Sequence, residues 1–242
     1  MRQIDPAPAL DPRHDRKLLA KVFAQHGRIH IPGALSAASA ARVHRCLTNE
    51  TTYGLVFNGG DKVFDLPPDQ VAKMTPAEMA GLVEAAGAGA RTGFQYLYES
   101  RRLSEAGEAY PDGAHYLAQV VAFLNGEAFL SFAREVTGEK RIAFADAQAT
   151  KYGPGHFLTT HTDLQPEKKR LAAFVLNMTP NWRPDWGGIL LFLDSDGQVA
   201  EGYSPVFNAL NLLKVPQPHL VSAVSAFAGG HRYSITGWLR AA

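Results

Sequence analysis

The C-terminal half of the chain alternates short apolar runs with turn-forming residues. Each run is shorter than an ordinary helix, and the segments between the runs are rich in Pro, Gly, Asn and Asp. Runs of this kind are typical of strands, and several in succession predict an all-β barrel or sandwich. The predicted strands are residues 170–177, 187–194, 209–215, 219–224 and 233–238.

The start of the chain predicts two short helices around a strand. Residues 17–23 indicate the first helix, and the alternating segment 28–31 predicts a strand that ends before a Pro-Gly pair. Ser36 is placed to cap an alanine-rich helix that reaches Leu47, with apolar residues gathered on one side.

A capping box predicts a further helix. Thr75 is followed by a proline at the first helical position and then by Glu78, so hydroxyl and carboxylate can satisfy free backbone N–H groups reciprocally. Two more helices are predicted over residues 116–124 and 127–136, the second ended by Gly138. We expect these last two helices to pack on the outside of the barrel.

The segments between these helices indicate strands, loops and one joint. Residues 51–66 are aromatic and contain glycine without a helical period, and residues 94–98 alternate as a strand does. The Ala/Gly run 85–90 predicts a flexible joint, and the charged segment 99–113 predicts a mobile loop.

Length and composition indicate one domain. The chain has 242 residues, of which 46% are hydrophobic and 19% charged, enough for a sizeable core. We interpret residues 1–242 as a single catalytic domain: an irregular arm over 1–15, helical support and loops over 16–140, and the strand-rich core with the candidate site over 141–242. The predicted fold class is α+β, mainly β.

Charge and cysteine content limit the classes of partner and the cellular compartment that we expect. Acids and bases are intermixed with a net charge of +1, so nothing indicates nucleic acid or a membrane as a partner. No apolar run resembles a membrane span or a signal peptide, and the lone Cys46 excludes an internal disulfide framework. We expect a cytoplasmic protein; the oligomeric state is left open. No serine nucleophile elbow, dinucleotide fingerprint or Walker sequence indicates hydrolase or nucleotide chemistry.

The segment His161-Thr162-Asp163 is the main candidate for chemistry. Alternate residues of an extended strand share a face, so an imidazole nitrogen and a carboxylate oxygen would converge there. A histidine from a later strand would complete a set of two His and one carboxylate. That set leaves three positions of an octahedral metal open, as in non-haem Fe(II) oxygenases.

Two histidines compete for the third ligand position. His219 opens a predicted strand after two prolines, which would hold it rigidly at the barrel mouth. His231 adjoins Arg232, and neighbouring strand residues face opposite sides, so His231 points away if Arg232 points inward. We prefer His219; the alternative is His231, with Arg240 as its following cation.

Four motifs carry a family resemblance. They are Tyr152-Gly-Pro-Gly-His-Phe-Leu-Thr-Thr-His161-Thr-Asp163, the Gly187-Gly188 pair, Pro218-His219-Leu-Val and Arg232-Tyr-Ser-Ile-Thr-Gly-Trp238. Together they resemble the prolyl-hydroxylase-type Fe(II)/2-oxoglutarate oxygenases, and the resemblance spans roughly residues 29–239. It implies a double-stranded β-helix (jelly-roll) core with supporting N-terminal helices. It also implies Fe(II) as the metal, 2-oxoglutarate and O2 as co-substrates, and ascorbate as a supporting reductant.

The resemblance also implies a co-substrate site. Arg232 offers a planar fork for the far carboxylate of 2-oxoglutarate. Ser234 either adds a hydroxyl donor, as in a pairing that some oxygenases use, or merely faces the sheet. Tyr152, nine residues before His161, is similar to a tyrosine that contacts the co-substrate in related prolyl hydroxylases; the alternative is a core aromatic residue.

The activity that the resemblance implies is hydroxylation of a C–H bond, with a prolyl residue of a protein or peptide as the first substrate. Retention of Asp163 argues against halogenation, for which related enzymes replace this carboxylate with a small residue. The alternatives are another peptide residue, a free amino-acid-derived small molecule, or a catalytically silent, metal-stabilised binding module. We further expect residues 51–64 and 94–102 to form a substrate recognition wall, and residues 99–113 to form either a lid over the site or an ordinary surface connection.

Overall fold

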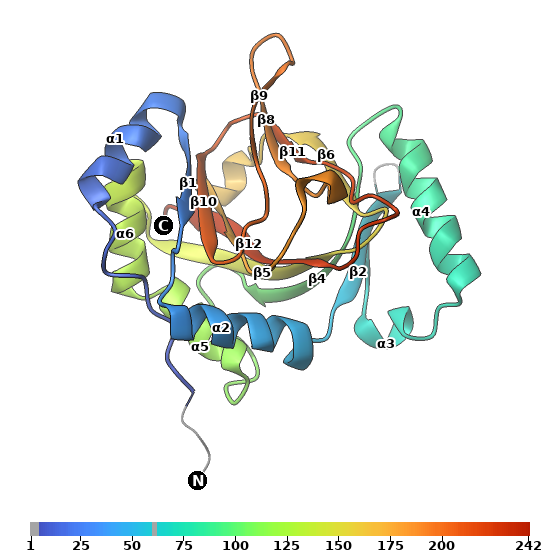
Figure 1. Ribbon diagram of the computed structural model, residues 1–242, viewed down its shortest axis with the longest axis horizontal. Helices are drawn as coiled ribbons and strands as arrows, with labels where there is room; N and C mark the ends of the chain where they lie inside the picture. The colour runs from blue at the N-terminus through green and yellow to red at the C-terminus, as the bar shows by residue number, and fades with distance from the viewer. Residues whose placement is uncertain (1–4, 60–61) are drawn as a thin grey trace.

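Antiparallel strands form the framework of the molecule. The computed structural model describes residues 5–59 and 62–242, and in this part of the chain twelve strands form one continuous sheet that curls round on itself (Figure 1). The strands are β1 (Arg28–Pro32), β2 (Gly54–Gly59), β3 (Lys62–Leu66), β4 (Tyr96–Ser104), β5 (Phe144–Tyr152), β6 (Phe157–His161), β7 (Arg170–Asn177), β8 (Leu190–Leu193), β9 (Val199–Tyr203), β10 (Ala209–Lys214), β11 (His219–Val221) and β12 (Arg232–Arg240).

The strands from β5 onwards form two facing layers. One layer has the order β10-β7-β12-β5 and the other has the order β6-β11-β8-β9. Successive strands therefore alternate between the layers along most of this region, which is the double-stranded β-helix expected from the sequence. Residues 16–140 also contribute strands, as predicted at 28–31, within 51–66 and at 94–98: β1 and β4 add to this sheet, and β4 carries the β2–β3 hairpin.

Helices cover the outside of the barrel. They are α1 (Arg16–His26), α2 (Ala37–Arg45), α3 (Pro68–Val71), α4 (Pro76–Ala90), α5 (Tyr116–Leu124) and α6 (Glu127–Thr137). Figure 1 shows α1 and α6 together on one side of the barrel and α4 on the other. The predicted caps are present: the Ser36 hydroxyl accepts from the Ser39 N–H, Thr75 and Glu78 form a capping box, and Gly138 ends α6 in a left-handed conformation.

Two predictions about connections were wrong. The Ala/Gly run 85–90 is no joint, because it forms the C-terminal part of α4 and buries Ala86. Alanine is the best helix former, and the capping box fixes the start of this helix, so the run continues it. The mobile loop predicted over residues 99–113 was wrong for its first part, because residues 99–104 belong to β4, where they pair with β5. Of the irregular arm, residues 5–15 lack a helix or regular strand, and Met1–Ile4 lie outside the described residues.

The core is divided between the outside and the inside of the barrel. Outside, Phe23, Val43, Leu117 and Phe132 from the helices pack in one cluster with sheet residues such as Ile235. Inside, the facing layers contribute a smaller apolar cluster, formed by Tyr152, Ala173, Leu190, Phe192, Leu213, Val215, Val221 and Val224. The larger outer cluster holds the helices to the sheet, and the smaller inner one leaves room for a cavity.

Side chains join the two ends of the sheet. β1 and β9 stand at opposite ends of the strand order. Arg28 Nε lies 2.6 Å from Glu201 Oε2, and the rings of His30 and Tyr203 lie 5.3 Å apart. The barrel thus closes through an ion pair and a ring contact between its terminal strands.

Among the described residues, no single helix is long and apolar enough to cross a membrane. The consecutive helices α5 and α6 pass that length and composition test only as a pair, which is bent by 44°. Their apolar residues are buried in the outer core cluster.

Gly237 provides a test of the central strand pairing. β12 lies between β5 and β7, and a Cβ at Gly237 would overlap the carbonyl oxygen of Asp146 and lie 2.9 Å from Cε1 of Phe174. We expect Gly237→Ala to lower the free energy of unfolding by about 1–3 kcal/mol, the usual range for overpacking. Urea denaturation measures this loss. Gly230→Ala is the control, because a methyl group on Gly230 would meet nothing within 4 Å; equal stability of the two variants would contradict the packing described.

Candidate metal centre

The His161-Thr162-Asp163 segment spans the end of a strand. β6 ends at His161, and Asp163 has φ 60°, so the expected fully extended segment was wrong. The left-handed region is open to few residues other than Gly, with Asp among the more tolerant. The turn, rather than the strand alternation, brings the Asp163 carboxylate back beside the His161 ring.

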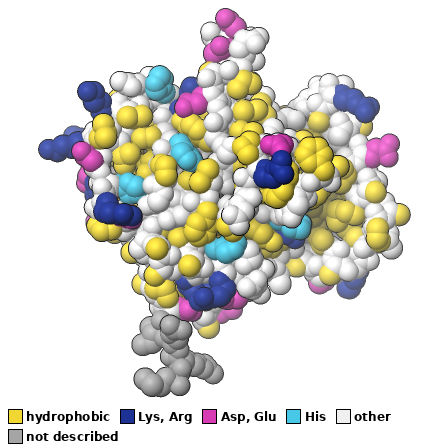
Figure 2. Space-filling model, in the orientation of Figure 1, with side chains coloured by type: hydrophobic (Ala, Val, Ile, Leu, Met, Phe, Trp, Pro, Cys, Tyr) yellow, Lys and Arg dark blue, Asp and Glu magenta, His cyan; other side chains and the backbone are white. Residues whose placement is uncertain are grey.

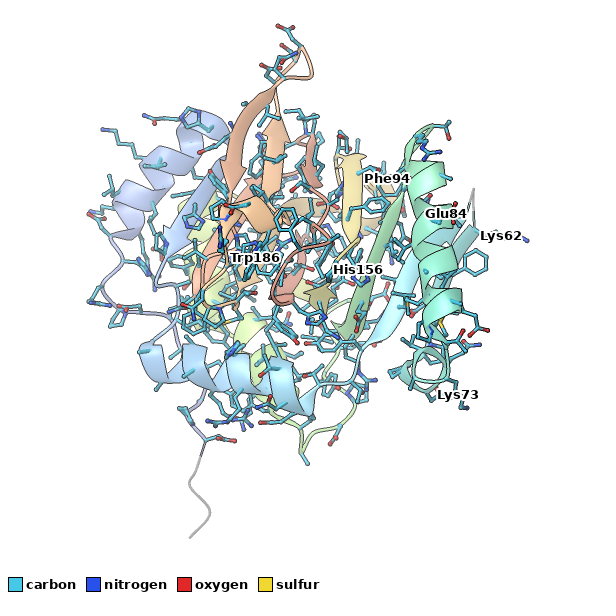
Figure 3. All side chains as sticks on the ribbon, turned by 45° about the vertical axis from the view of Figure 1, so that its right-hand side comes forward. Lys62, Lys73, Glu84, Phe94, His156 and Trp186 are labelled. Carbon is cyan, nitrogen blue, oxygen red and sulfur yellow. The ribbon has the colours of Figure 1, made fainter. Side chains whose placement is uncertain are left out.

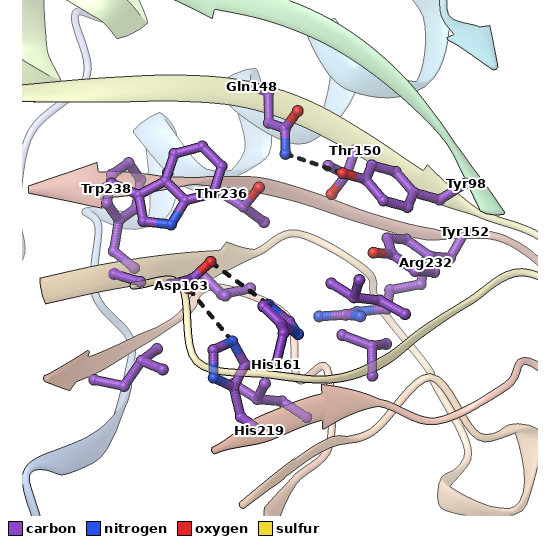
Figure 4. Close-up of a pocket in the computed structure, with 18 residues that line it drawn as sticks. Tyr98, Gln148, Thr150, Tyr152, His161, Asp163, His219, Arg232, Thr236 and Trp238 are labelled. Atoms are coloured by element: carbon purple, nitrogen blue, oxygen red, sulfur yellow. Dashed lines mark hydrogen bonds and ion pairs between the residues drawn. The ribbon is translucent and has the colours of Figure 1, made fainter. Parts of the chain in front are cut away.

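Three side chains converge at this turn (Figure 4). His161 and His219 are cross-strand partners on β6 and β11, and their ring centroids lie 4.2 Å apart. Asp163 Oδ1 lies 3.5 Å from His161 Nε2, and Oδ2 lies 3.4 Å from His219 Nε2. One ligand atom from each residue lies within 4.8 Å of the others, the only such group of three His, Cys, Asp or Glu residues in the described chain.

Backbone carbonyls fix the tautomers of both rings. His161 Nδ1 lies 3.0 Å from the Thr159 carbonyl oxygen, and His219 Nδ1 lies 2.8 Å from the Gln217 carbonyl oxygen. A carbonyl only accepts hydrogen bonds, so each Nδ1 must be the donor. In the neutral rings, both Nε2 lone pairs are then directed to the carboxylate. Outer hydrogen bonds of this kind orient metal-ligating imidazoles.

The protonation states agree with this arrangement. Burial would raise the pKa of Asp163, but the adjacent imidazoles of His161 and His219 outweigh burial and hold this pKa below its usual value. Burial lowers the pKa of His219, which favours its neutral ring. A carboxylate and two imidazole lone pairs thus face one another, and acceptors in such a cluster need a shared cation. Imidazole with carboxylate suits a divalent transition metal such as iron.

The competing histidine lies elsewhere. His231 is exposed at the start of β12, with its ring 6.2 Å from that of Tyr233, and it is not part of the converging group. Arg240 is paired with Asp146 at 2.7 Å. The geometry therefore brings His219, and not His231, to His161 and Asp163.

A cavity of about 80 Å³ extends inward from the three converging residues. Arg232 enters it beside Tyr152, whose ring centroid lies 5.1 Å from the guanidinium carbon, and Arg232 is only 2% exposed. Its Nε and Nη1 have no hydrogen-bond partner. Burial lowers the pKa of Arg232, yet a guanidinium stays charged in proteins. A buried cation with free donors needs an anion in this cavity.

The pair Gly187-Gly188 makes room for that arginine. Both glycines have positive φ, and a Cβ on Gly188 would lie 3.4 Å from Cδ of Arg232 and 3.3 Å from Val224. The pair therefore combines an unusual turn with close packing behind Arg232.

Ser234 does not line the cavity. Its hydroxyl is fully buried and lies 2.8 Å from the hydroxyl of Thr150, its cross-strand partner on β5. Thr150 lines the cavity instead, as do Gln148 and Thr236, which pair across the same two strands. These three polar residues were not predicted from the sequence. The alternation of β5 around Tyr152 was the signal that could have found them.

A wider groove of about 960 Å³ opens on the outer side of His161 and Asp163. Its walls come from α4 and the following loop, from β3 and β4, and from the loop after β6. Phe94, which is 50% exposed, lies between the barrel and α4 (Figure 3). The two segments proposed as a recognition wall thus contribute side chains, among them Asn58, Phe94 and Tyr96. No residue of 105–113 lines this groove.

Comparisons with known proteins agree with this geometry. Residues 147–240 match the family model of the 2OG-Fe(II) oxygenase superfamily, and this region holds His161, Asp163, His219 and Arg232. None of the curated protein sequences matches the chain.

Several solved structures share the fold. An oxidoreductase of the 2OG-Fe(II) oxygenase family from Burkholderia pseudomallei has a TM-score of 0.64 at 14% identity, covering 93% of this chain and 91% of that one. A prolyl hydroxylase from Trichoplax adhaerens, in complex with a hypoxia inducible factor peptide fragment, gives 0.61 at 16% identity over 93% and 89%. A Pseudomonas putida prolyl-4-hydroxylase gives 0.56 at 19% identity over 97% and 98%. A non-haem α-ketoglutarate-dependent epimerase of nogalamycin biosynthesis gives 0.54 at 9% identity over 95% and 84%.

Residues 147–240 thus resemble the 2OG-Fe(II) oxygenase superfamily, and the double-stranded β-helix and the converging acceptors agree with that similarity. The fold of the chain is of the prolyl-hydroxylase-like type. The family uses Fe(II), 2-oxoglutarate and O2, and the residues around the cavity suit both the metal and the dicarboxylate.

Removal of single histidines tests the ligand set. We expect His219→Ala to abolish stoichiometric binding of Fe(II) or Co(II), because only two of the three converging acceptors remain. His231→Ala should bind one ion per chain as the native protein does. Anaerobic equilibrium dialysis measures both variants. Full binding by His219→Ala together with lost binding by His231→Ala would show that the third ligand is His231.

His156 makes the stability of the turn between β5 and β6 depend on pH. Its Nδ1 accepts the Gly153 N–H at 3.1 Å, and burial lowers its pKa below the ordinary 6.5. Between the lowered folded pKa and about 6.5, the unfolded chain binds more protons, so stability falls as the pH drops through this window. His156→Asn keeps an acceptor that does not titrate. We expect the native protein to lose more free energy of unfolding than His156→Asn on going from about pH 7 to about pH 5; parallel curves would refute this role.

Proposed function

We propose that this oxygenase hydroxylates a C–H bond of a prolyl residue in a protein or peptide. In this proposal His161, Asp163 and His219 hold Fe(II), and Arg232 binds the far carboxylate of 2-oxoglutarate. Tyr152 forms the wall beside that carboxylate. When bound, the iron and 2-oxoglutarate supply the oxidising power through their reaction with O2, and the protein positions them.

The observation that carries the proposal is the pairing of two unsatisfied groups in one small cavity. Three acceptors that need a shared cation meet at its mouth, and the unpaired Nε and Nη1 of Arg232 lie within it. A short dicarboxylate that binds a metal at one end and a guanidinium at the other satisfies both. The rings of Tyr98 and Tyr152 stack 4.9 Å apart in the wall of this cavity.

The shape of the groove supports a polypeptide substrate. Segments from β3, β4, α4 and the loop after β6 contribute to the groove, whose volume is about 960 Å³. Exposed apolar residues stand on its rim, namely Val63, Phe94 and Leu164. An open groove with an apolar rim suits a chain laid across the surface better than a small molecule that must be enclosed. The similarity in fold to two prolyl hydroxylases supports a prolyl residue as the target.

The face of the molecule shown in Figure 2 does not favour nucleic acid as a partner. On the face shown in Figure 2, Lys and Arg side chains are interspersed with Asp and Glu, so that no broad basic surface faces the viewer. Nucleic acid is bound chiefly through such surfaces.

Turnover with candidate peptides tests the proposal. Proline-containing peptides and a cell extract are incubated with Fe(II), 2-oxoglutarate and O2, with ascorbate added, and analysed by mass spectrometry. We expect a gain of one oxygen on proline together with succinate release. Oxygen gain on another residue or on a small molecule would show that the substrate is not a prolyl residue. The absence of any 2-oxoglutarate turnover by metal-loaded protein would favour a silent, metal-stabilised binding module.

Arg232 carries a prediction of its own. We expect Arg232→Gln to raise the KM for 2-oxoglutarate about a hundredfold, because loss of a charge-assisted fork costs about 3 kcal/mol and each 1.4 kcal/mol is a factor of ten. Arg240→Gln is the discriminating control, since Arg240 is the cation of the alternative set. Its KM should stay near the native value. A raised KM for 2-oxoglutarate in Arg240→Gln, with a native KM in Arg232→Gln, would show that Arg240 binds the co-substrate.

A further inference from the structure

We infer that a second pocket, at the C-terminal end of β4, binds an acidic side chain of the polypeptide substrate about four residues from the residue that reacts. The inference rests on the proposed function and adds a contact point remote from the metal centre. We call this hollow the side pocket; its volume is about 390 Å³. Its polar lining residues include Asp65, Tyr96, Ser100, Arg101, Arg102 and Tyr110.

The side pocket adjoins the groove on the outer side of the metal centre, the outer groove. Val63, Tyr96 and Tyr98 line both hollows, so these residues form a shared wall between them. Tyr98 also lines the inner cavity, together with His161 and Asp163 (Figure 4). A polypeptide that lies in the outer groove and crosses the shared wall therefore passes beside the metal centre before it enters the side pocket.

The side pocket lies where β4 loses its neighbour on one side. The two segments predicted as a recognition wall, 51–64 and 94–102, supply more than half of its lining. Pairing between β2 and β4 stops with Gly54 opposite Ser100. In the described chain no strand pairs with residues 101–104 on that side, although β5 still pairs with them on the other. The end of β4 is thus an open edge that a ligand can reach.

Arg101 is a cation without an acidic partner at this open edge. Its Nε donates to the Tyr110 hydroxyl at 3.3 Å, and its guanidinium carbon lies 5.9 Å from the centroid of the Tyr110 ring. It forms no ion pair with a described residue. Because the Tyr110 hydroxyl accepts from Arg101, its own proton is available to a further acceptor. The guanidinium and the phenol together suit an incoming carboxylate.

Arg102 is the second cation of the side pocket. Its Nη1 lies 2.7 Å from Glu105 Oε2, and the exposed fractions of the two side chains are 72% and 41%. An ion pair this exposed contributes at most about 1 kcal/mol, so Glu105 is no strong competitor for Arg102. Neighbouring strand residues leave opposite faces of a strand. Arg101 and Arg102 therefore approach the open edge from both faces of β4.

The acid of the side pocket lies on a different strand. Asp65 of β3 stands opposite Val56 of β2, which in turn stands opposite Tyr98 of β4. It is the one acid among the described lining residues, and it lies two strands across from Tyr98 rather than further along β4. The two positive charges therefore gather at the end of β4, and an acidic side chain is favoured there.

Spacing along β4 sets the position of this acid in the substrate. Tyr98 marks the metal centre because it lines the inner cavity with the candidate ligands, and Arg102 follows four residues later. A strand rises about 3.3 Å per residue, so the two Cα atoms lie about 13 Å apart. An extended substrate chain spans about 3.3–3.6 Å per residue and needs about four residues to cover this distance.

A set of peptides measures this position. Each is a capped fifteen-residue chain of Gly and Ala with one central proline, and it carries one Glu two, four or six residues before or after that proline. A matched peptide carries Gln at the same place. Binding is measured by calorimetry on protein loaded with Zn(II) and 2-oxoglutarate, which requires no turnover. Oxygen gain is measured separately by mass spectrometry with Fe(II), 2-oxoglutarate and O2.

The variants remove single donors from the side pocket. Arg101→Gln and Arg102→Gln each remove one charge, and Tyr110→Phe removes a hydroxyl while keeping the ring. Arg91→Gln is the matched control, because Arg91 is an exposed cation at the end of α4 that lines neither the side pocket nor the outer groove. Affinity for Co(II) and KM for 2-oxoglutarate are measured for every variant to show that the metal centre is intact.

We expect the peptide with Glu four residues from proline, on one side of it, to bind the native protein about tenfold more tightly than its Gln counterpart. The preference should be smaller at two and six residues. It should disappear in Arg101→Gln, decrease in Arg102→Gln and Tyr110→Phe, and stay unchanged in Arg91→Gln. Gln peptides should bind all five proteins alike.

Three results would overturn the inference: no preference for Glu over Gln at any position, a preference that survives in both arginine variants, or variants that weaken Glu and Gln peptides equally. Oxygen gain on proline without any preference for Glu would refute the side pocket and leave the proposed function intact. A preference for Glu that depends on Arg101, without oxygen gain on any peptide, would support the side pocket and refute prolyl hydroxylation.

Discussion

The convergence of hydrogen-bond acceptors at the barrel mouth is the constraint on which the rest of the site depends. Backbone carbonyls hold the Nδ1 protons of His161 and His219, so both Nε2 lone pairs point to the Asp163 carboxylate at 3.5 and 3.4 Å. No proton of these neutral rings lies between the facing atoms, and such an arrangement is repulsive without a cation. The pairing of β6 with β11 and the turn at Asp163 maintain it, which indicates a preorganised metal centre.

Arg232 and Arg170 lie on either side of the metal centre, and both carry buried nitrogens without hydrogen-bond partners. Arg232 is sealed in the inner cavity with two unpaired nitrogens, and Arg170 stands in the outer groove on Trp238 with a third. Each is desolvated, and each keeps donors that the protein leaves free. The barrel thus places one buried cation in the inner cavity and another in the outer groove.

Much of the fold and of the candidate metal centre could be predicted from the sequence, because these features depend on local signals. The strand 170–177, the helix caps and the choice of His219 all follow from alternation, capping chemistry and the neighbours of each residue. The turn at Asp163 was missed because strand spacing assumes an extended backbone. The Ala/Gly run 85–90 was misjudged because the cap of the helix to which it belongs lies ten residues earlier, at Thr75. The positions of Thr150 and Arg170 in the cavity and groove depend on strand register, which a single sequence does not reveal.

The most direct test of the metal centre is to replace the carboxylate by its amide without changing its shape. Asp163→Asn removes the negative charge among the three acceptors while preserving side-chain size. Anaerobic titration with Fe(II), followed by calorimetry and by the thermal unfolding temperature, compares it with the native protein. We predict one tightly bound ion per native chain, with a raised unfolding temperature, and much weaker binding in the variant. Equal binding by the two proteins, or no binding by the native one, would contradict a metal centre built on this carboxylate.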